Sequence, residues 1–199
     1  MTDYTQRLPV EHIDEGGADA FAQDFFSLWR RTEGCLTDEY ENFAPRLVIF
    51  DGVPNVNDSP DLLECGFDAL PLKLLGSTWT EDAEHLRQFL PPDYRAMIGQ
   101  AYYDAITQRR PVFDIVKADM RNDAGDPVDA LYHRLILPCR ESDFEIVLSY
   151  SFEVGTPHPV LGASSASENR VDCRPEKQDR ASLFRAVAAA TQKRSCHTG

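Results

Sequence analysis

The sequence contains no run of eighteen apolar residues, the length at which a segment becomes a candidate for spanning a membrane. Its beginning, MTDYTQRLPVEHIDEGG, lacks the basic-then-apolar order of a secretory signal peptide. Basic side chains are scarce, since 20 Lys and Arg stand against 33 Asp and Glu and give a net charge of −13. An acidic chain is a poor partner for nucleic-acid backbones and for anionic membranes. We therefore expect a soluble, cytoplasmic protein with no nucleic-acid partner and no membrane insertion.

Metal-binding and catalytic motifs are missing as well. The five cysteines and five histidines show no CxxC, HxxxH or HxH spacing, so the sequence predicts reduced thiols and no metal site. The motifs GxSxG, GxxxxGKS/T, GxGxxG and HExxH are absent too. We expect a protein that binds something and has no catalytic activity.

The clearest pattern that is present is a predicted helix over 93–108, with the sequence DYRAMIGQAYYDAITQ. Its apolar side chains recur every three or four residues and therefore share one face of a helix. Asp93 follows Pro91-Pro92 and is the expected N-cap, while Pro111 prevents the helix from continuing. One side of this helix is expected to pack against other elements.

Three strand-like runs follow the helix, over 112–121, 128–137 and 144–154. Apolar and mixed positions alternate along them, and polar turn residues separate them. An antiparallel meander with the helix across its face makes an α+β layer, which is the expected fold class.

Weaker patterns precede the long helix. Strands are expected over 47–50 and 62–67, a short helix over 68–75 that ends at Gly76, and a further helix over 80–90. The expected order is thus helix, two strands, short helices, long helix and three strands.

This order, together with four local segments, resembles the PAS domain in a variant form found as a stand-alone bacterial domain. The segments are LWR at 28–30, DLLECGFDALPLKLLGSTW at 61–79, AYYDAITQRRPVFD at 101–114 and YHRLILP at 132–138. The resemblance implies a five-stranded antiparallel sheet with helices on one face, an N-terminal capping helix and a sensory role. The long helix lacks the histidine that binds iron in heme-type PAS domains, and the cysteine motif of the light-sensing type is absent. The sequence therefore identifies no cofactor.

The space between the long helix and the sheet is the candidate ligand site. Its expected wall consists of Tyr94, Met97, Ile98, Ala101, Tyr102, Tyr132 and Arg134. A buried Arg134 would require a carboxylate or a ligand anion beside it, whereas on the outer face its stem would cover apolar surface. The tyrosines are either ligand contacts or packing residues. Both alternatives stay open at this point.

A second apolar stripe lies in the helix expected over 18–31. Its aromatic members are Phe21, Phe25, Phe26 and Trp29. These rings are expected to be buried either by packing against the sheet of the same subunit or by packing across a homodimer interface. The partners that we expect are a second copy of the chain, a signalling protein and a small-molecule ligand.

Composition divides the chain into three parts. Residues 1–17 are expected to be disordered or extended, 18–154 to form the PAS-like sensory domain, and 155–199 to be a flexible linker with a basic, helix-compatible tail. The predicted function is a cytoplasmic sensory or regulatory module that binds a small ligand or a protein and signals through protein contacts. The alternative is an enzyme or a small-molecule carrier on a cone-shaped α+β fold resembling the ketosteroid isomerase group. Two strands before the long helix favour the first reading, and an initial helix pair with a long meander favours the second.

Overall fold

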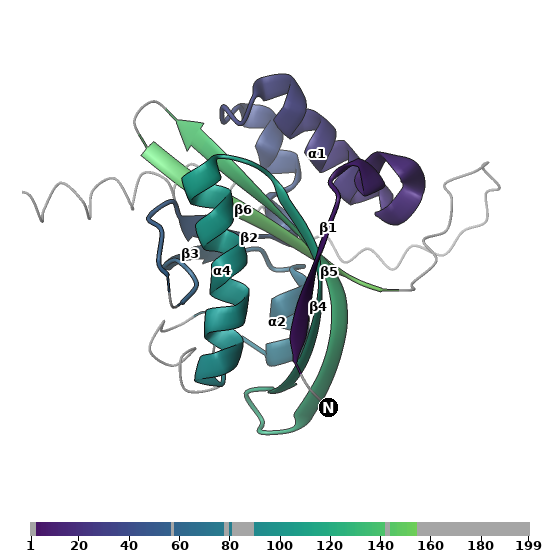
Figure 1. Ribbon diagram of the computed structural model, residues 1–199, viewed down its shortest axis with the longest axis vertical. Coiled ribbons are helices and arrows are strands. Elements are labelled where there is room, and N and C mark those ends of the chain that lie inside the picture. Colours follow the sequence, from purple (N-terminus) through teal and green to yellow (C-terminus); the bar gives the residue numbers. More distant parts are fainter. Residues whose placement is uncertain (1–2, 57, 78–79, 81–89, 142–143, 155–199) are drawn as a thin grey trace, which may run out of the picture.

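The computed structural model describes residues 3–56, 58–77, 80, 90–141 and 144–154, which form an α+β fold around an open antiparallel sheet (Figure 1). Six strands lie in the order β1-β4-β5-β6-β2-β3. The strands are β1 (Tyr4–Leu8), β2 (Leu47–Asp51), β3 (Leu62–Cys65), β4 (Val112–Arg121), β5 (Pro127–Glu141) and β6 (Phe144–Glu153). The helices include α1 (Ala20–Thr32), α2 (Leu70–Leu75) and α4 (Pro92–Gln108), and shorter helical turns span Ile13–Gly17, Asp38–Asn42 and Ala44–Arg46.

The predicted meander is confirmed, because β5 pairs antiparallel with β4 on one side and with β6 on the other. The register places Asp114 opposite Arg134, and Arg134 opposite Ser151. Residues directly opposite each other in an antiparallel pair project from the same face of the sheet. These three polar side chains therefore form a row across one face.

The expectation of five strands is wrong, because β1 adds a sixth strand at the edge beside β4. Its pairing runs from Tyr4 opposite Lys117 to Leu8 opposite Phe113. The residues of this strand are exposed or partly buried. Its sequence, YTQRL, shows no clear alternation of apolar and polar residues. Backbone pairing, which leaves no mark in the side-chain pattern, holds this part of the N-terminal segment.

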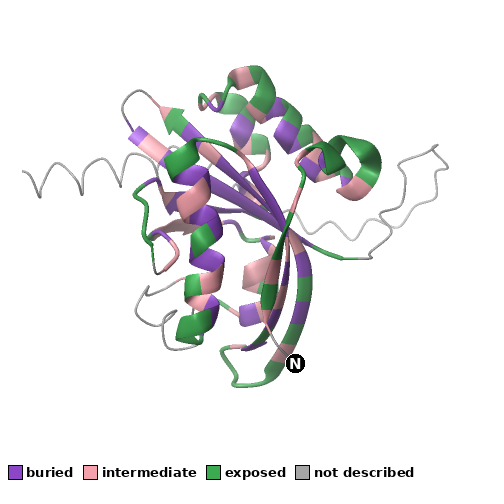
Figure 2. Cartoon of the chain, viewed as in Figure 1, coloured by how far each residue is buried: buried purple, intermediate pink, exposed green. Residues whose placement is uncertain are grey.

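Helices cover both faces of the sheet, and the expectation of helices on one face is therefore wrong. α1 packs on the face that carries Leu135 and Leu148, whereas α2 and α4 pack on the face that carries Ile136 and Val147. Both sets of alternating residues are apolar in the central strands, so both faces have to be removed from water. The strands are accordingly mostly buried where they pass between α1 and α4 (Figure 2).

The predicted long helix is confirmed, with a small shift at its start. The N-cap of α4 is Pro91, so Asp93 lies in the first turn and not at the cap position. Proline is favoured at the first helical position, here Pro92, because its missing N–H would have no partner there anyway. α2 ends at Gly76, which has a φ of 91°, as expected for a glycine that stops a helix.

Two expected segments lie outside the described residues: the tail over 155–199, and the helix over 80–90 apart from its two end residues. Within the part of the chain that the structure describes, no helix is both long and apolar enough to cross a membrane.

Candidate functional site

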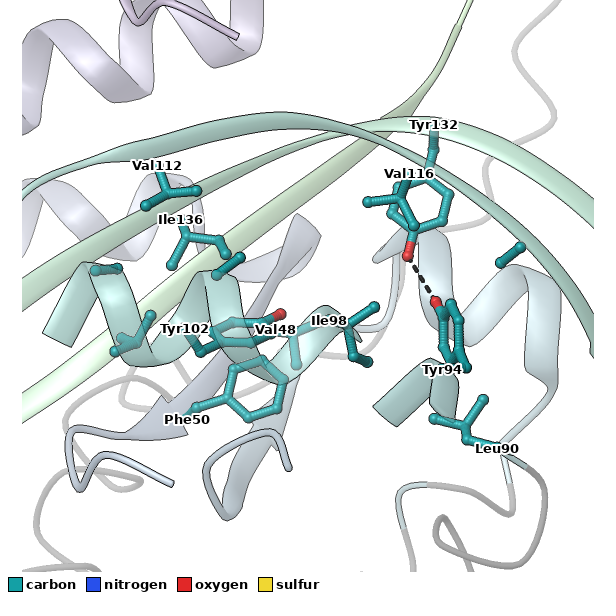
Figure 3. Packing of buried hydrophobic residues seen from close by; sticks show 14 of the residues in the cluster. Val48, Phe50, Leu90, Tyr94, Ile98, Tyr102, Val112, Val116, Tyr132 and Ile136 are labelled. Atoms are coloured by element: carbon teal, nitrogen blue, oxygen red, sulfur yellow. Dashed lines mark hydrogen bonds between the residues drawn. The ribbon is translucent and has the colours of Figure 1, made fainter. Parts of the chain in front are cut away.

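A cavity of about 70 Å³ lies between α2, α4 and the sheet face that these helices cover. α4 contributes Tyr94, Ile98 and Tyr102, which are spaced by four residues and therefore lie on one side of the helix. Across from them, β5 contributes Tyr132 and Arg134. The Tyr94 and Tyr132 hydroxyls point toward one another between α4 and β5 (Figure 3).

Arg134 is buried in the wall of this cavity and forms a two-point ion pair with Asp114 of the neighbouring strand. Its Nε and Nη2 atoms donate to the Asp114 carboxylate at 3.1 and 2.7 Å. The two residues are only 2% and 1% exposed. The Arg134 guanidinium also lies 5.0 Å from the centroid of the Tyr102 ring, within range of a cation–π contact. The sequence allowed Arg134 to be either buried beside an anionic group or exposed on the outer face. In the structure it is buried, and the anionic group is the carboxylate of Asp114.

The Arg134 guanidinium keeps its charge and the nearby phenols keep their protons, for different reasons. Burial is the largest single effect on Arg134 and lowers its pKa, but the charge and hydrogen bonds of Asp114 together with Tyr102 and Tyr132 outweigh it and hold the pKa well above its ordinary value. Burial likewise raises the pKa of Tyr94, Tyr102 and Tyr132, so these phenols stay protonated. The cavity wall thus presents hydrogen-bond donors.

The phenols form two separate hydrogen bonds. The Tyr94 and Tyr132 hydroxyl oxygens are 2.9 Å apart, and either can be the donor. The hydroxyl that accepts in this pair keeps its own proton for a further bond. Tyr102 donates to Ser149 Oγ of β6 at 3.1 Å.

Ser149 and Ser151 are site residues that the sequence analysis missed. Both line the cavity, and both are nearly buried, at 3% and 7% exposed. Ser149 is bonded to Tyr102, whereas the Ser151 hydroxyl has no hydrogen-bond partner among the described residues. The signal that could have found them is the alternation of two serines in the otherwise apolar run IVLSYSF.

The loop between β2 and β3 closes one side of the cavity and is fixed to α4. Ser59 of this loop lines the cavity, and its neighbour Asp58 accepts a hydrogen bond from Arg95 at 2.6 Å. The backbone of Asp58 also lies so close to Gly99 that a Cβ at residue 99 would be 2.6 Å from the Asp58 carbonyl oxygen. Glycine in the middle of α4 thus permits this close approach.

The structure brings together five of the seven residues expected in the pocket: Tyr94, Ile98, Tyr102, Tyr132 and Arg134 all line the cavity. Met97 and Ala101 do not line it. They pack within the hydrophobic cluster between α4 and the sheet, Ala101 buried and Met97 partly buried.

The four aromatic residues of α1 pack against the sheet of their own chain. Phe25 and Phe26 are 0% and 4% exposed, while Phe21 and Trp29 are partly buried. Trp29 Nε1 donates to the Pro138 carbonyl oxygen at 2.8 Å. Phe25 and Phe26 therefore pack within their own chain, which is one of the two predicted alternatives. The homodimer stays a prediction.

A second polar cluster lies beneath α1, on the sheet face away from the cavity. Asp19 caps α1 by accepting from the Ala22 backbone N–H, and it also accepts from the Tyr150 hydroxyl, both at 2.7 Å. His133 lies on the same face, with its ring 5.4 Å from that of Phe113 and 5.0 Å from that of Phe152.

Within the described ranges, no group of three or more His, Cys, Asp or Glu side chains is placed to hold a metal ion. The cavity is a small, mainly apolar space that is bordered by the hydroxyls of tyrosine and serine and by Arg134. Comparison of the chain with protein-family models, with curated proteins and with solved structures finds no significant match.

Proposed function

We propose that this chain is a cytoplasmic sensory or regulatory module of the PAS type, which binds a small molecule in the cavity between α4 and the sheet. The observation that carries the proposal is where the buried polar groups lie. Arg134 and Ser151 border a cavity, and no described residue satisfies the Ser151 hydroxyl. A hydroxyl that borders a cavity and is not bonded within the described part of the chain can bond a molecule that enters the cavity.

The order of the elements along the chain supports the same proposal. Between α1 and α4 the chain forms β2, β3 and α2, and after α4 it forms the meander of β4, β5 and β6. This is the order that the PAS resemblance implies, with β1 added at the edge. The enzyme or carrier alternative has less support, because it calls for a helix pair first and most of the strands after the long helix.

The module signals through protein contacts, and β1 is the element best placed to transmit the state of the cavity. Arg7 of β1 lies opposite Asp114 in the sheet, and its guanidinium donates to Asp104 of α4 at 2.9 Å. A ligand that shifts Arg134 therefore acts on Asp114, and through β4 on β1. A second subunit or a signalling partner reads this change at the N-terminal part of the chain.

Native mass spectrometry of the full chain, purified from its own host, tests the proposal. The wild type is expected to carry a small non-covalent adduct that Ile98→Trp loses, because an indole at residue 98 fills the cavity. Ala96→Trp is the matched control, since Ala96 is on the exposed side of α4. Leu74→Phe fills the cavity from α2 and is expected to lose the adduct too. It provides a second cavity-filling variant in case Ile98→Trp does not fold. No adduct on the wild type, or equal adducts on all four proteins, contradicts the proposal.

A further inference from the structure

The residues of the cavity indicate the chemical class of its ligand, an inference that rests on the proposed function. We infer that the ligand is uncharged and monocyclic, with an apolar body and one hydrogen-bond acceptor, a carbonyl or a hydroxyl oxygen. The acceptor lies against Ser151, and the body lies among the apolar residues of α2, α4 and β2.

The balance of charge in the wall argues for an uncharged ligand. Arg134 is the one charged side chain among the described residues that line the cavity. Its charge is already matched by Asp114, which is 1% exposed. An anion would compete with Asp114 for the guanidinium and leave a buried carboxylate unpaired, which is strongly unfavourable. A cation would meet a guanidinium with no spare carboxylate beside it.

The unused hydrogen-bonding groups argue for an acceptor on the ligand. The ion pair with Asp114 uses Nε and Nη2 of Arg134, and the same guanidinium also interacts with Tyr102. Ser151 lies directly opposite Arg134 in the sheet, and no described residue bonds its hydroxyl. The Ser151 hydroxyl is thus a donor in the cavity wall that an oxygen of the ligand can use.

The remaining wall sets the body and the size of the ligand. Val48 and Phe50 of β2, Leu74 of α2 and Ile98 of α4 present only carbon to the cavity. A volume of about 70 Å³ has room for roughly five water molecules. Displacing them takes a single ring with a short substituent, whose burial against these side chains is favourable.

The test uses three probes of similar shape on the full-length protein: acetophenone, which is a neutral ketone, ethylbenzene, which is apolar, and benzoate, which is an anion. Binding is followed by NMR through the shifts of the Ile98 and Leu74 methyl groups. Acetophenone is expected to bind tightest and benzoate weakest. Ser151→Ala is expected to weaken acetophenone by about three- to tenfold, the effect of one hydrogen bond, and to leave ethylbenzene unchanged.

Ser27→Ala is the matched control, because it also removes one serine hydroxyl but lies exposed on α1 and does not line the cavity. Its effect on acetophenone is expected to stay below about twofold, since the ligand does not use this hydroxyl. Benzoate binding tighter than acetophenone overturns the inference and leaves the proposed function standing. An equal loss of acetophenone and ethylbenzene in Ser151→Ala also overturns it. If none of the probes shifts these methyl groups, the inference fails, and the proposed function fails as well only if the wild type also carries no adduct in native mass spectrometry.

Discussion

Asp114 and Arg134 lie directly opposite each other on β4 and β5, with 2.7 Å between Arg134 Nη2 and Asp114 Oδ2. Both residues are almost completely buried, and the pair borders the cavity. A pair buried this deeply adds little net stability, because the hydration lost by both charges offsets their attraction. Each charge nevertheless depends on the other, since neither can reach bulk water. The pair therefore keeps a charged group at the cavity wall at little net cost to stability.

This dependence predicts that single and double substitutions have very different effects. Asp114→Asn leaves the Arg134 charge without its partner and is expected to lower the free energy of unfolding by about 3–5 kcal/mol. The double variant Asp114→Leu with Arg134→Met removes both charges and is expected to be as stable as the wild type or more so. Urea denaturation of the three proteins measures this difference.

Asp104→Asn is the control, because it removes the carboxylate of an ion pair near the surface, where Arg7 and Asp104 side chains are 47% and 26% exposed. A change of about 1 kcal/mol or less is expected there. If Asp114→Asn unfolds at the same urea concentration as the wild type, the buried charge of Arg134 does not depend on Asp114.

A second prediction concerns Gly99, where the usual effect of alanine in a helix is reversed. Glycine to alanine in a helix interior normally raises stability by about 1 kcal/mol. In α4, however, a Cβ at residue 99 would meet the Asp58 backbone at 2.6 Å, and backbone atoms cannot rotate out of the way. Gly99→Ala is therefore expected to lower stability by about 1–3 kcal/mol and to speed amide exchange in the loop between β2 and β3.

Ala96→Gly serves as the reference, since Ala96 is exposed on the same helix and reports the propensity effect alone. A loss of about 0.5–1 kcal/mol is expected there, with no change in exchange of the loop. Stabilisation by Gly99→Ala would show that the loop does not pack on α4.

The long helix and the meander could be predicted from the sequence because their apolar patterns are long and regular. β1 could not, since an exposed edge strand is held by backbone pairing to β4, and the sequence of β1 does not name its partner. The packing of α1 on the second face of the sheet stayed one of two alternatives for a related reason. The sequence shows that both sets of positions in the central strands are apolar, but not which element covers each face.

The candidate site was predictable in part. Spacing by four along one helix was enough to group Tyr94, Ile98 and Tyr102. The partner of Arg134 lies 20 residues away on another strand, and only the pairing register shows that Asp114 faces it. Ser151 was missed as a cavity residue because serines in an apolar strand have many structural explanations, and only its position beside a cavity distinguishes it.

A third prediction follows from the packing of α1. Phe25 is completely buried and contacts the rings of Tyr40 and Phe43, with centroids 6.2 and 5.2 Å away. Phe25→Ala is expected to lower the free energy of unfolding by about 3–5 kcal/mol, as measured by thermal or urea denaturation. Phe21→Ala is expected to lose less, because Phe21 is only partly buried.

The same burial changes how a test of the homodimer has to be read. A polar substitution at Phe25 disrupts the interior of one chain, so an altered elution volume from that variant reports unfolding and not a lost interface. Phe21 is only partly buried, so Phe21→Ala is the better probe in size-exclusion chromatography. Equal stability of Phe25→Ala and the wild type would contradict the packing of α1 on the sheet.

The fourth prediction is a pH dependence of stability that comes from His133. Burial lowers the pKa of His133 below its ordinary value of 6.5, and the charges of Asp19 and Asp114 offset only part of this. Above pH 6.5 the imidazole is neutral in both states and contributes nothing. As the pH falls below 6.5, the unfolded state takes up a proton before the folded state does, so stability falls until the pH has passed the folded pKa.

His133→Phe is expected to remove this decline, which urea denaturation at a series of pH values between about 8 and 5 measures. The substitution suits the site, because the ring contacts those of Phe113 and Phe152 and its Nδ1 atom has no hydrogen-bond partner among the described residues. His12→Phe is the matched control at an exposed histidine and is expected to keep the wild-type slope. The difference in slope between wild type and His133→Phe reports the contribution of this imidazole. Parallel curves for these two proteins would mean that His133 takes up its proton equally in the folded and unfolded states, and that the sheet face beneath α1 admits water.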